Sequence, residues 1–210
     1  MMGSYKKIKS VLTVGLGNPS LTSDALGPET VKHLAVTFPV GNAQSKSARG
    51  IAISAFAPDV AGNTGIETAE LIRGIVNTVR PTLVIAIDAL AARSAERLAS
   101  VIQLSDGGIS PGSGLGNRHK EISHRTLGIP VIALGIPTVV PSSAMMAEVL
   151  SLVHTSSDAR DIQARLEQGR RFFVTPKEID LIVRSASLLL ADAIHRACGM
   201  DGMRHNVIFD

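Results

Sequence analysis

The chain has 210 residues, of which 45% are hydrophobic and 3% aromatic, so we expect one domain over residues 1–210 with a core of aliphatic side chains. A net charge of +3 without interleaved aromatic residues argues against direct nucleic-acid binding. The one cysteine, Cys198, excludes an intrachain disulfide and a metal site built from several cysteines. No apolar run follows the basic N-terminus for long enough to form a signal peptide or a membrane span, so we expect a soluble protein of a reducing compartment with no membrane partner.

The first predicted elements are a buried strand at Val11–Val14 and a helix with Pro28 in its first turn, where the missing N–H costs nothing. Between them, Gly15 and Gly17 suggest a dinucleotide-binding turn. The fingerprint requires a third glycine where Ser20 stands, and the helix begins too late to hold a pyrophosphate at its N-terminus. The pattern therefore does not support a dinucleotide site.

A second strand and a longer helix are predicted next. Ile51–Ala57 is an apolar run of strand length. Thr64 and Glu67 after it have the spacing of a capping box, which marks a helix start. An apolar stripe at helical spacing supports that helix: Ile66, Leu71, Ile72, Ile75 and Val79.

The third strand is predicted at Thr82–Ile87, and its continuous apolar run is typical of a strand buried on both faces of a parallel sheet. Asp88 would then stand at its carboxyl end, where open α/β sheets hold their ligands. A short helix or turn over Ala91–Leu98 and a candidate edge strand at Val101–Leu104 follow. A glycine-rich loop, Ser105–Glu121, comes next, and its length indicates a functional role.

The last part of the chain adds one strand and two helices. Ile129–Gly135 predicts another buried strand, and a helix starting at Ser142 or Ser143 follows it. Residues 155–171 are polar and charged, and we expect a short helix or a mobile insertion there. Thr175–Glu178 has the form of a second capping box, opening a helix with these core-facing residues: Ile179, Ile182, Val183, Ala186, Leu189, Leu190 and Ala193. Strands alternating with helices predict an α/β fold, a three-layer α/β/α sandwich with a mostly parallel sheet.

Two carboxylates follow the first and third strands and form the strongest candidate for chemistry. If these strands are neighbours, Asp24 and Asp88 point into one crevice. Two close carboxylates cannot both ionise easily, so the pair would share a proton, and one member could activate water while the other protonates a carbonyl or a leaving amine. The alternative is that each aspartate caps a helix.

Several stretches resemble the germination proteases of spore-forming bacteria, in the same order along the chain. They are residues 15–18, 24–28, 64–68, 86–94, 111–117, 126–140 and 174–180. The resemblance implies an aspartic-type endopeptidase that degrades small acid-soluble spore proteins, with the fold of the hydrogenase maturation proteases. It implies Asp24 and Asp88 as the catalytic pair. The following residues are expected to bind substrate: Asn18, Gly112, Ser113, Gly114, Asn117, Arg118 and Thr138.

The resemblance also carries expectations about cofactors and partners. Maturation proteases hold a metal with two acidic residues and a histidine, but the histidine position falls near Gly112 here, so we expect no metal and no cofactor. A homo-oligomer inside the spore or forespore, in its cytoplasm, is implied. Family members carry a longer region before the first strand, part of which is removed from a zymogen. Here Val11 already begins that strand, so the resemblance implies a shortened member.

Two residues depart from the family pattern, and two other features each have two interpretations. Asp59 and Ser110 stand where the family pattern leads us to expect glycine and histidine. Arg118, His119 and Lys120 form either a rim for an acidic substrate or a solvated basic turn. Thr138 forms a hydrogen bond to one of the paired aspartates or belongs to a turn. For the whole chain, the alternatives to an aspartic-type peptidase are an inactive binding or assembly protein and a metal-assisted maturation-type peptidase.

Overall fold

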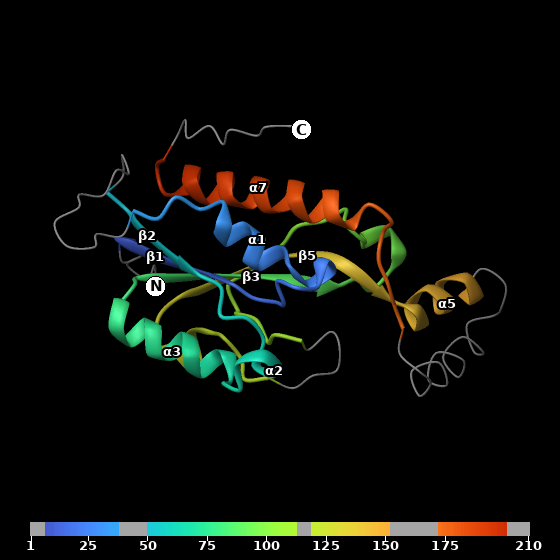
Figure 1. Ribbon diagram of the computed structural model, residues 1–210, viewed down its shortest axis with the longest axis horizontal. Helices are drawn as coiled ribbons and strands as arrows, with labels where there is room; N and C mark the ends of the chain where they lie inside the picture. Colours follow the sequence, from blue (N-terminus) through green and yellow to red (C-terminus); the bar gives the residue numbers. More distant parts are fainter. Residues whose placement is uncertain (1–6, 38–49, 113–118, 152–171, 201–210) are drawn as a thin grey trace, which may run out of the picture.

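The computed structural model describes residues 7–37, 50–112, 119–151 and 172–200, and these form a three-layer arrangement of helices on both faces of a central sheet (Figure 1). The strands are β1 (Ser10–Gly15), β2 (Ala52–Phe56), β3 (Leu83–Ala91), β4 (Gln103–Ser105), β5 (Val131–Pro141) and β6 (Phe173–Val174). The helices are α1 (Leu26–Lys32), α2 (Ala61–Thr64), α3 (Thr68–Val79), α4 (His124–Leu127), α5 (Ser142–Ser151) and α7 (Ile179–Ala197), with short 3₁₀ helices η1 (Thr22–Asp24) and η2 (Ala95–Arg97).

The sheet is mostly parallel, as the alternation of elements predicts. Its strand order is β2-β1-β3-β5-β4 within the described residues, and the short β6 pairs with the far end of β5. The pairs β1–β2, β1–β3 and β3–β5 are parallel, whereas the exposed edge strand β4 runs antiparallel to β5. The predicted α/β/α class and the candidate edge strand are therefore confirmed.

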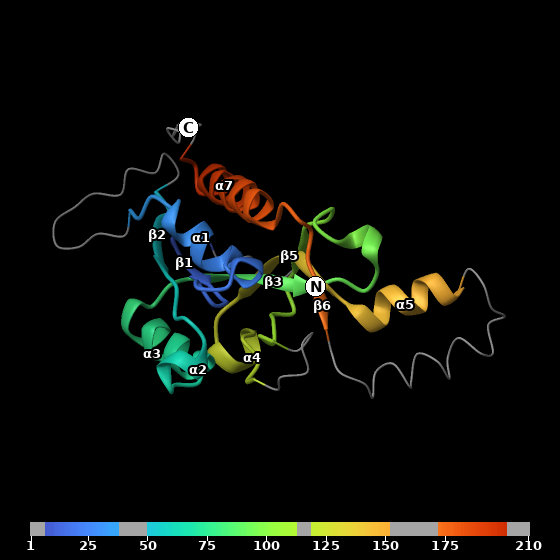
Figure 2. The same ribbon diagram turned by 45° about the vertical axis from the view of Figure 1, so that its right-hand side comes forward.

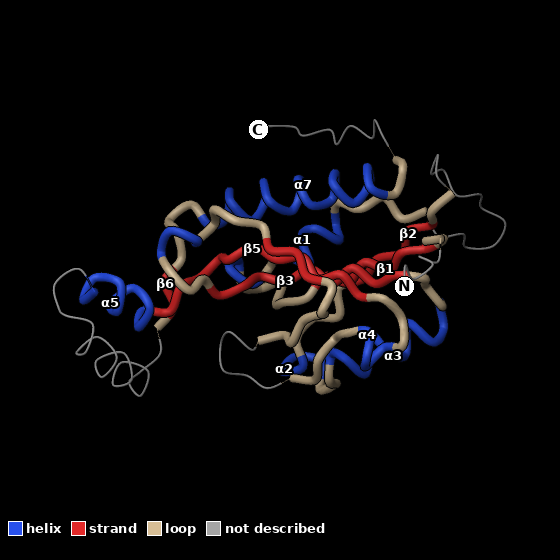
Figure 3. The backbone as a smooth tube through the Cα atoms, turned by 180° about the vertical axis from the view of Figure 1, so that it is seen from behind, coloured by secondary structure: helices blue, strands red, loops and turns tan. Residues whose placement is uncertain are grey.

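Two apolar clusters hold the helices on the sheet. Seen from behind, α1 and α7 lie on one face and α2, α3 and α4 on the other (Figure 3). Ile87, Leu26 and Leu190 belong to the cluster under α1 and α7, while Val84 and Ile72 belong to the cluster under α3. Alternate residues of β3 supply both clusters, which explains why its sequence is an unbroken apolar run.

The strands of the sheet differ in length, and this difference creates the site. The last paired residue of β1 is Gly15, opposite Ile87, and the Leu16 N–H still donates to the Ile87 carbonyl. β3 continues to Ala91 alongside β5. The prediction that Asp88 ends its strand is therefore wrong: Asp88 lies inside β3, one residue beyond the end of the neighbouring β1.

Both predicted capping boxes are wrong, because each helix begins after them. Glu67 is itself the residue before α3, and Gly65 ends the short α2 in a left-handed conformation. α7 begins only at Ile179. A capping box occurs instead at α4, where the Ser123 N–H donates to the Thr126 hydroxyl.

Only some of the residues of α7 that were predicted to face the core are buried. Val183 and Leu190 are buried as expected, but Leu189 is 55% exposed and Ala193 is also exposed. His195 near the end of the same helix is buried, and its Nε2 accepts the Ala35 N–H. This contact ties the end of α7 to the segment after α1.

α5 extends away from the sheet beyond the end of β5 (Figure 2). It starts at Ser142, as predicted. The predicted insertion at 155–171 lies outside the described residues. No helix within the described ranges is long and apolar enough to cross a lipid bilayer.

Candidate active site

Asp88 is the most deeply buried acidic residue of the site. Only 6% of its surface is exposed, and β1 and β5 lie on either side of its strand. Burial, and to a smaller extent the nearby Asp24 carboxylate, together raise the pKa of Asp88 from 3.8 to about 8, against a hydrogen bond from the Ala89 N–H. Asp88 therefore holds its proton at neutral pH.

Asp24 approaches from the loop between β1 and α1. It ends the 3₁₀ helix η1, and the Asn18 N–H donates to its Oδ2 at 2.7 Å. Burial raises the pKa of Asp24, and this hydrogen bond from Asn18 counteracts the rise because it favours the ionised form. The two carboxylates thus occupy different environments, which is how one pair supplies both an acid and a base.

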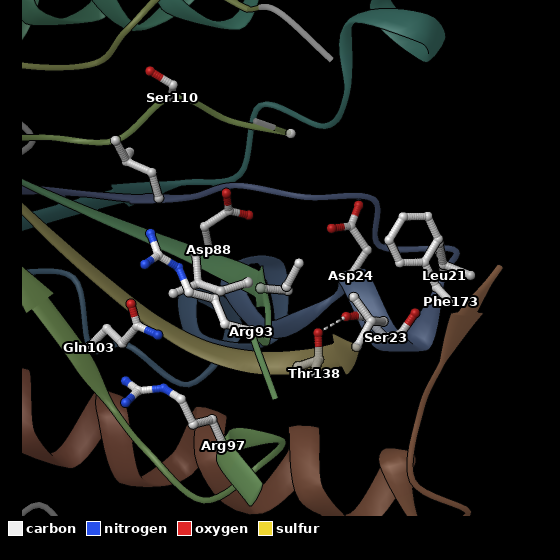
Figure 4. Close-up of a pocket in the computed structure, with 16 residues that line it drawn as sticks. Leu21, Ser23, Asp24, Asp88, Arg93, Arg97, Gln103, Ser110, Thr138 and Phe173 are labelled. Carbon is white, nitrogen blue, oxygen red and sulfur yellow. Dashed lines mark hydrogen bonds between the residues drawn. The ribbon is translucent and has the colours of Figure 1, made fainter. Parts of the chain in front are cut away.

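A pocket of about 630 Å³ opens over the pair. Both carboxylates face into it (Figure 4). Arg93, Arg97 and Gln103 lie on one side of the pair, and Leu21 and Phe173 on the other. The pocket therefore has a cationic side and an apolar side, with the titratable pair between them. No salt bridge within the described residues engages either guanidinium group.

The predicted substrate-binding residues fall into three groups. Gly112 and Thr138 line the pocket. Asn18 does not line it: its side-chain oxygen accepts the Ser20 N–H at 2.9 Å, so this residue shapes the turn that holds Asp24. The remaining ones lie outside the described residues: Ser113, Gly114, Asn117 and Arg118.

Thr138 does not donate to either aspartate. Its hydroxyl donates to the Ser23 carbonyl at 2.6 Å. Ser110 also lines the pocket, so the position where the family pattern suggests histidine does face the site. Asp59 has a left-handed backbone with φ of 65°, which explains why glycine is the expected residue there.

Near the end of the glycine-rich loop, His119 and Lys120 contact α3 and the residue that precedes it. Glu67 accepts the Lys120 N–H at 3.0 Å, and its other oxygen lies 3.4 Å from His119 Nδ1. The Lys120 ammonium group pairs with Glu70. His119 and Lys120 are thus engaged with α3 and its cap.

Sequence reasoning missed several residues of the pocket wall. Arg97, Gln103, Leu21 and Phe173 come from four separate segments. Arg93 lies in one of the stretches that resemble the family, residues 86–94. Its position in the pocket wall follows only from the structure, in which β3 ends beside the pocket. No local pattern marks these residues, because they are brought together only by the packing of β4, β6, η2 and the start of η1 around the end of the sheet.

Within the described ranges, no group of three or more histidine, cysteine, aspartate or glutamate side chains is arranged to hold a metal. Ser110 and Gly112, the positions near which the family pattern leads us to expect a histidine, line the same pocket, and neither carries an imidazole. The donor atoms that the described residues offer therefore do not match a histidine-containing metal site, and the titratable groups of the pocket are the two carboxylates.

Comparison with known proteins gives consistent results. The family profile described as Germination protease matches residues 2–168. The germination protease of Caldanaerobacter subterraneus subsp. tengcongensis is 40% identical over 220 residues, covering 93% of this chain and 68% of the relative. That of Priestia megaterium is 52% identical over 146 residues, covering 69% of this chain and 40% of the relative. That of Bacillus subtilis is 46% identical over 162 residues, with 75% and 44% covered. The matches thus span between 40% and 68% of these relatives' lengths.

Solved structures show a distant likeness. A NiFe hydrogenase maturation protease from Thermococcus kodakarensis KOD1 aligns with a TM-score of 0.48 and 13% identity, covering 91% of this chain and 94% of that one. A hydrogenase 2 maturation peptidase from a Thaumarchaeota archaeon aligns with a TM-score of 0.41 and 13% identity, covering 92% and 100%.

Proposed function

The chain belongs to the germination protease family, and we propose that it is an endopeptidase that uses Asp24 and Asp88 to hydrolyse peptide bonds of small acid-soluble spore proteins. The resemblance seen in the sequence is confirmed as family membership. The observation that carries the proposed mechanism is the placement of the two carboxylates in one pocket, with Asp88 protonated at neutral pH because it is buried beside Asp24.

The different environments of the two carboxylates favour different roles for them in the first step, the attack of water. Asp24 is the base, since the Asn18 N–H stabilises its ionised form, and Asp88 is the acid, since its buried site favours the protonated form. The water oxygen attacks the peptide carbonyl carbon as Asp24 takes a water proton and Asp88 gives its proton to the carbonyl oxygen. The resulting diol collapses: the C–N bond breaks, Asp24 passes its proton to the departing nitrogen, and Asp88 regains a proton from a diol hydroxyl.

The walls of the pocket favour an extended peptide with mixed side chains. Arg93 and Arg97 offer guanidinium groups to acidic side chains, and Leu21 and Phe173 offer an apolar surface. An acidic protein substrate suits the cationic side.

Family membership supports three further parts of this proposal. The enzyme would act inside the spore or forespore, it would assemble as a homo-oligomer, and its activity would be controlled through a zymogen. Each of these is a property of the whole protein, whereas the matches cover part of the relatives' lengths.

The test is incubation of the purified protein with a small acid-soluble spore protein, followed by mass spectrometry of the products. We expect cleavage by the parent, and losses of at least about a hundredfold in Asp24→Asn and Asp88→Asn. Asp106→Asn is the matched control, because Asp106 is exposed and does not line the pocket.

Three outcomes would contradict the proposed mechanism. Equal rates of cleavage by Asp88→Asn and the parent would show that the carboxylate pair does not catalyse the reaction. Binding without cleavage between about pH 4 and about pH 8, the range in which the pair changes protonation, would identify an inactive binding protein. Loss of activity in a chelator and its recovery with a divalent metal would identify a metal-assisted peptidase.

A further inference from the structure

Thr138 stands at an irregularity in the pairing of β3 with β5. Leu90 pairs with Pro137, but the next residue of β3, Ala91, pairs with Val139, so Thr138 is an extra residue in β5. Such a β-bulge turns a side chain in a direction that regular alternation would not allow, and bulges are frequent beside active sites.

The bulge directs the Thr138 side chain toward the loop that carries Asp24. Thr138 is only 1% exposed, and its hydroxyl donates to the Ser23 carbonyl oxygen at 2.6 Å (Figure 4). Ser23 directly precedes Asp24 in η1. A buried hydrogen bond between residues so far apart in the chain fixes the height of η1 above the sheet.

The other side of Asp24 is held by the turn after β1. The Asn18 N–H binds its carboxylate, and Gly17 lies against its carbonyl group. These contacts attach Asp24 to β1. The hydrogen bond between Thr138 and Ser23 attaches Asp24 to β5 as well. β5 is the strand that pairs with β3, which carries Asp88.

From this geometry we propose that Thr138 is a positioning residue, which sets the approach of Asp24 to Asp88 by anchoring Ser23 to the bulge in β5. This role replaces the expected contact between Thr138 and substrate. Its catalytic consequence rests on the proposed peptidase function, whereas its structural consequence does not.

Three substitutions separate this role from a purely structural one. Thr138→Val keeps the shape of the side chain and removes the donor, and Thr138→Ser keeps the donor. The matched control is Thr13→Val in β1, because Thr13 is also fully buried while its hydroxyl has no hydrogen-bond partner among the described residues.

We expect Thr138→Val to lower kcat about 10- to 100-fold, since a small misplacement of a catalytic group has an effect of this size. KM should stay within about twofold of the parent, because no ground-state contact with substrate is lost. Thr138→Ser and Thr13→Val should cleave at nearly the parental rate. A raised KM with unchanged kcat would show that Thr138 contacts substrate, and parental kinetics in Thr138→Val would also overturn the proposal.

A second measurement does not depend on cleavage: NMR titration of the aspartate carboxyl carbons in the parent and in each variant. The charged groups that line the pocket with Asp88 are Asp24, Arg93 and Arg97. When Thr138→Val releases η1, Asp24 moves away and water enters, so the pKa of Asp88 should fall toward its ordinary value. It should stay at the parental value in Thr13→Val.

The two measurements distinguish failure of this proposal from failure of the proposed function. A parent that cleaves no spore protein but shows the pKa change in Thr138→Val would contradict the peptidase and support the positioning role. An unchanged Asp88 titration in Thr138→Val would overturn the positioning role, whatever the parent cleaves.

Discussion

Gly17 lies directly against the backbone of Asp24. A Cβ atom added to Gly17 would come within 2.0 Å of the Asp24 carbonyl oxygen, and the Gly17 φ of +111° lies in the region that side chains disfavour. The loop can therefore bring Asp24 over the end of β1 only with glycine at this position. This close approach explains why residue 17 is glycine, a residue that by its sequence pattern suggests a dinucleotide-binding turn.

Gly17→Ala should therefore displace η1 and destabilise the fold. We expect a loss of about 2 kcal/mol or more in the free energy of unfolding, because backbone strain and a steric clash add. Gly65→Ala is the matched control: Gly65 also has a positive φ, of 69°, but has open space around it. Gly65→Ala should lower the free energy of unfolding by only about 1 kcal/mol. Denaturant unfolding measures both, and equal losses would refute the role of the contact.

Stability should depend on pH through Asp88. Its pKa rises from 3.8 to about 8 on folding, so between these values the folded state holds a proton that the unfolded chain has released. The free energy of unfolding should thus fall as the pH rises through this window, by up to roughly 1.4 kcal/mol per pH unit, and level off above it.

Asp88→Asn should remove most of this slope and make the protein more stable than the parent at pH 8. A smaller slope of the same sign should remain, because burial also raises the pKa of Asp24. Thermal unfolding across the pH window tests this, with Asp106→Asn as a control that should keep the parental slope. A parental slope in Asp88→Asn would mean that Asp88 ionises normally in the folded protein.

Arg93 should contribute to the binding of acidic substrates. Arg93→Ala should raise KM about two- to fivefold for a peptide with a glutamate beside the cleaved bond, because an exposed charge pair contributes at most about 1 kcal/mol. The effect should shrink at high salt and disappear when glutamine replaces that glutamate. Arg73→Ala, which changes an exposed arginine on α3 that pairs with Glu70, is the control and should leave KM unchanged. An equal rise for both peptides would exclude charge recognition.

Glu67 should stabilise the end of the glycine-rich loop at Lys120. Its pKa lies below the ordinary 4.5, mainly because it accepts the Lys120 N–H. Glu67→Ala should cost about 1 kcal/mol at neutral pH and speed hydrogen exchange of the Lys120 amide. In the parent this stabilisation should disappear as the pH falls below 4.5, where Glu67 takes up a proton. Glu29→Ala breaks only a surface pair with Lys32 and should leave the Lys120 amide unaffected.

Much of the fold follows from local sequence patterns. The apolar runs at Val11–Val14 and Thr82–Ile87 predict strands of a parallel sheet, because strands buried on both faces require continuous apolar sequence. That these two strands are neighbours comes from the structure. Long matching stretches also predict the family. Boundaries were less predictable: the continuation of β3 through Ala89–Ala91 depends on pairing with β5, and its two alanines carry no strong strand signal.

The sequence by itself determined the class of the fold and the family, and it singled out the two aspartates as the candidate pair, since these inferences depend on hydrophobic patterning and on residue identity. Only the tertiary structure decided what surrounds the aspartates. The burial that keeps Asp88 protonated, the cationic wall with Arg93, and the bulge that turns Thr138 toward Ser23 each require strands and loops distant in the chain to meet. Burial and hydrogen-bond partners are properties of the packed chain, and local sequence does not encode them separately.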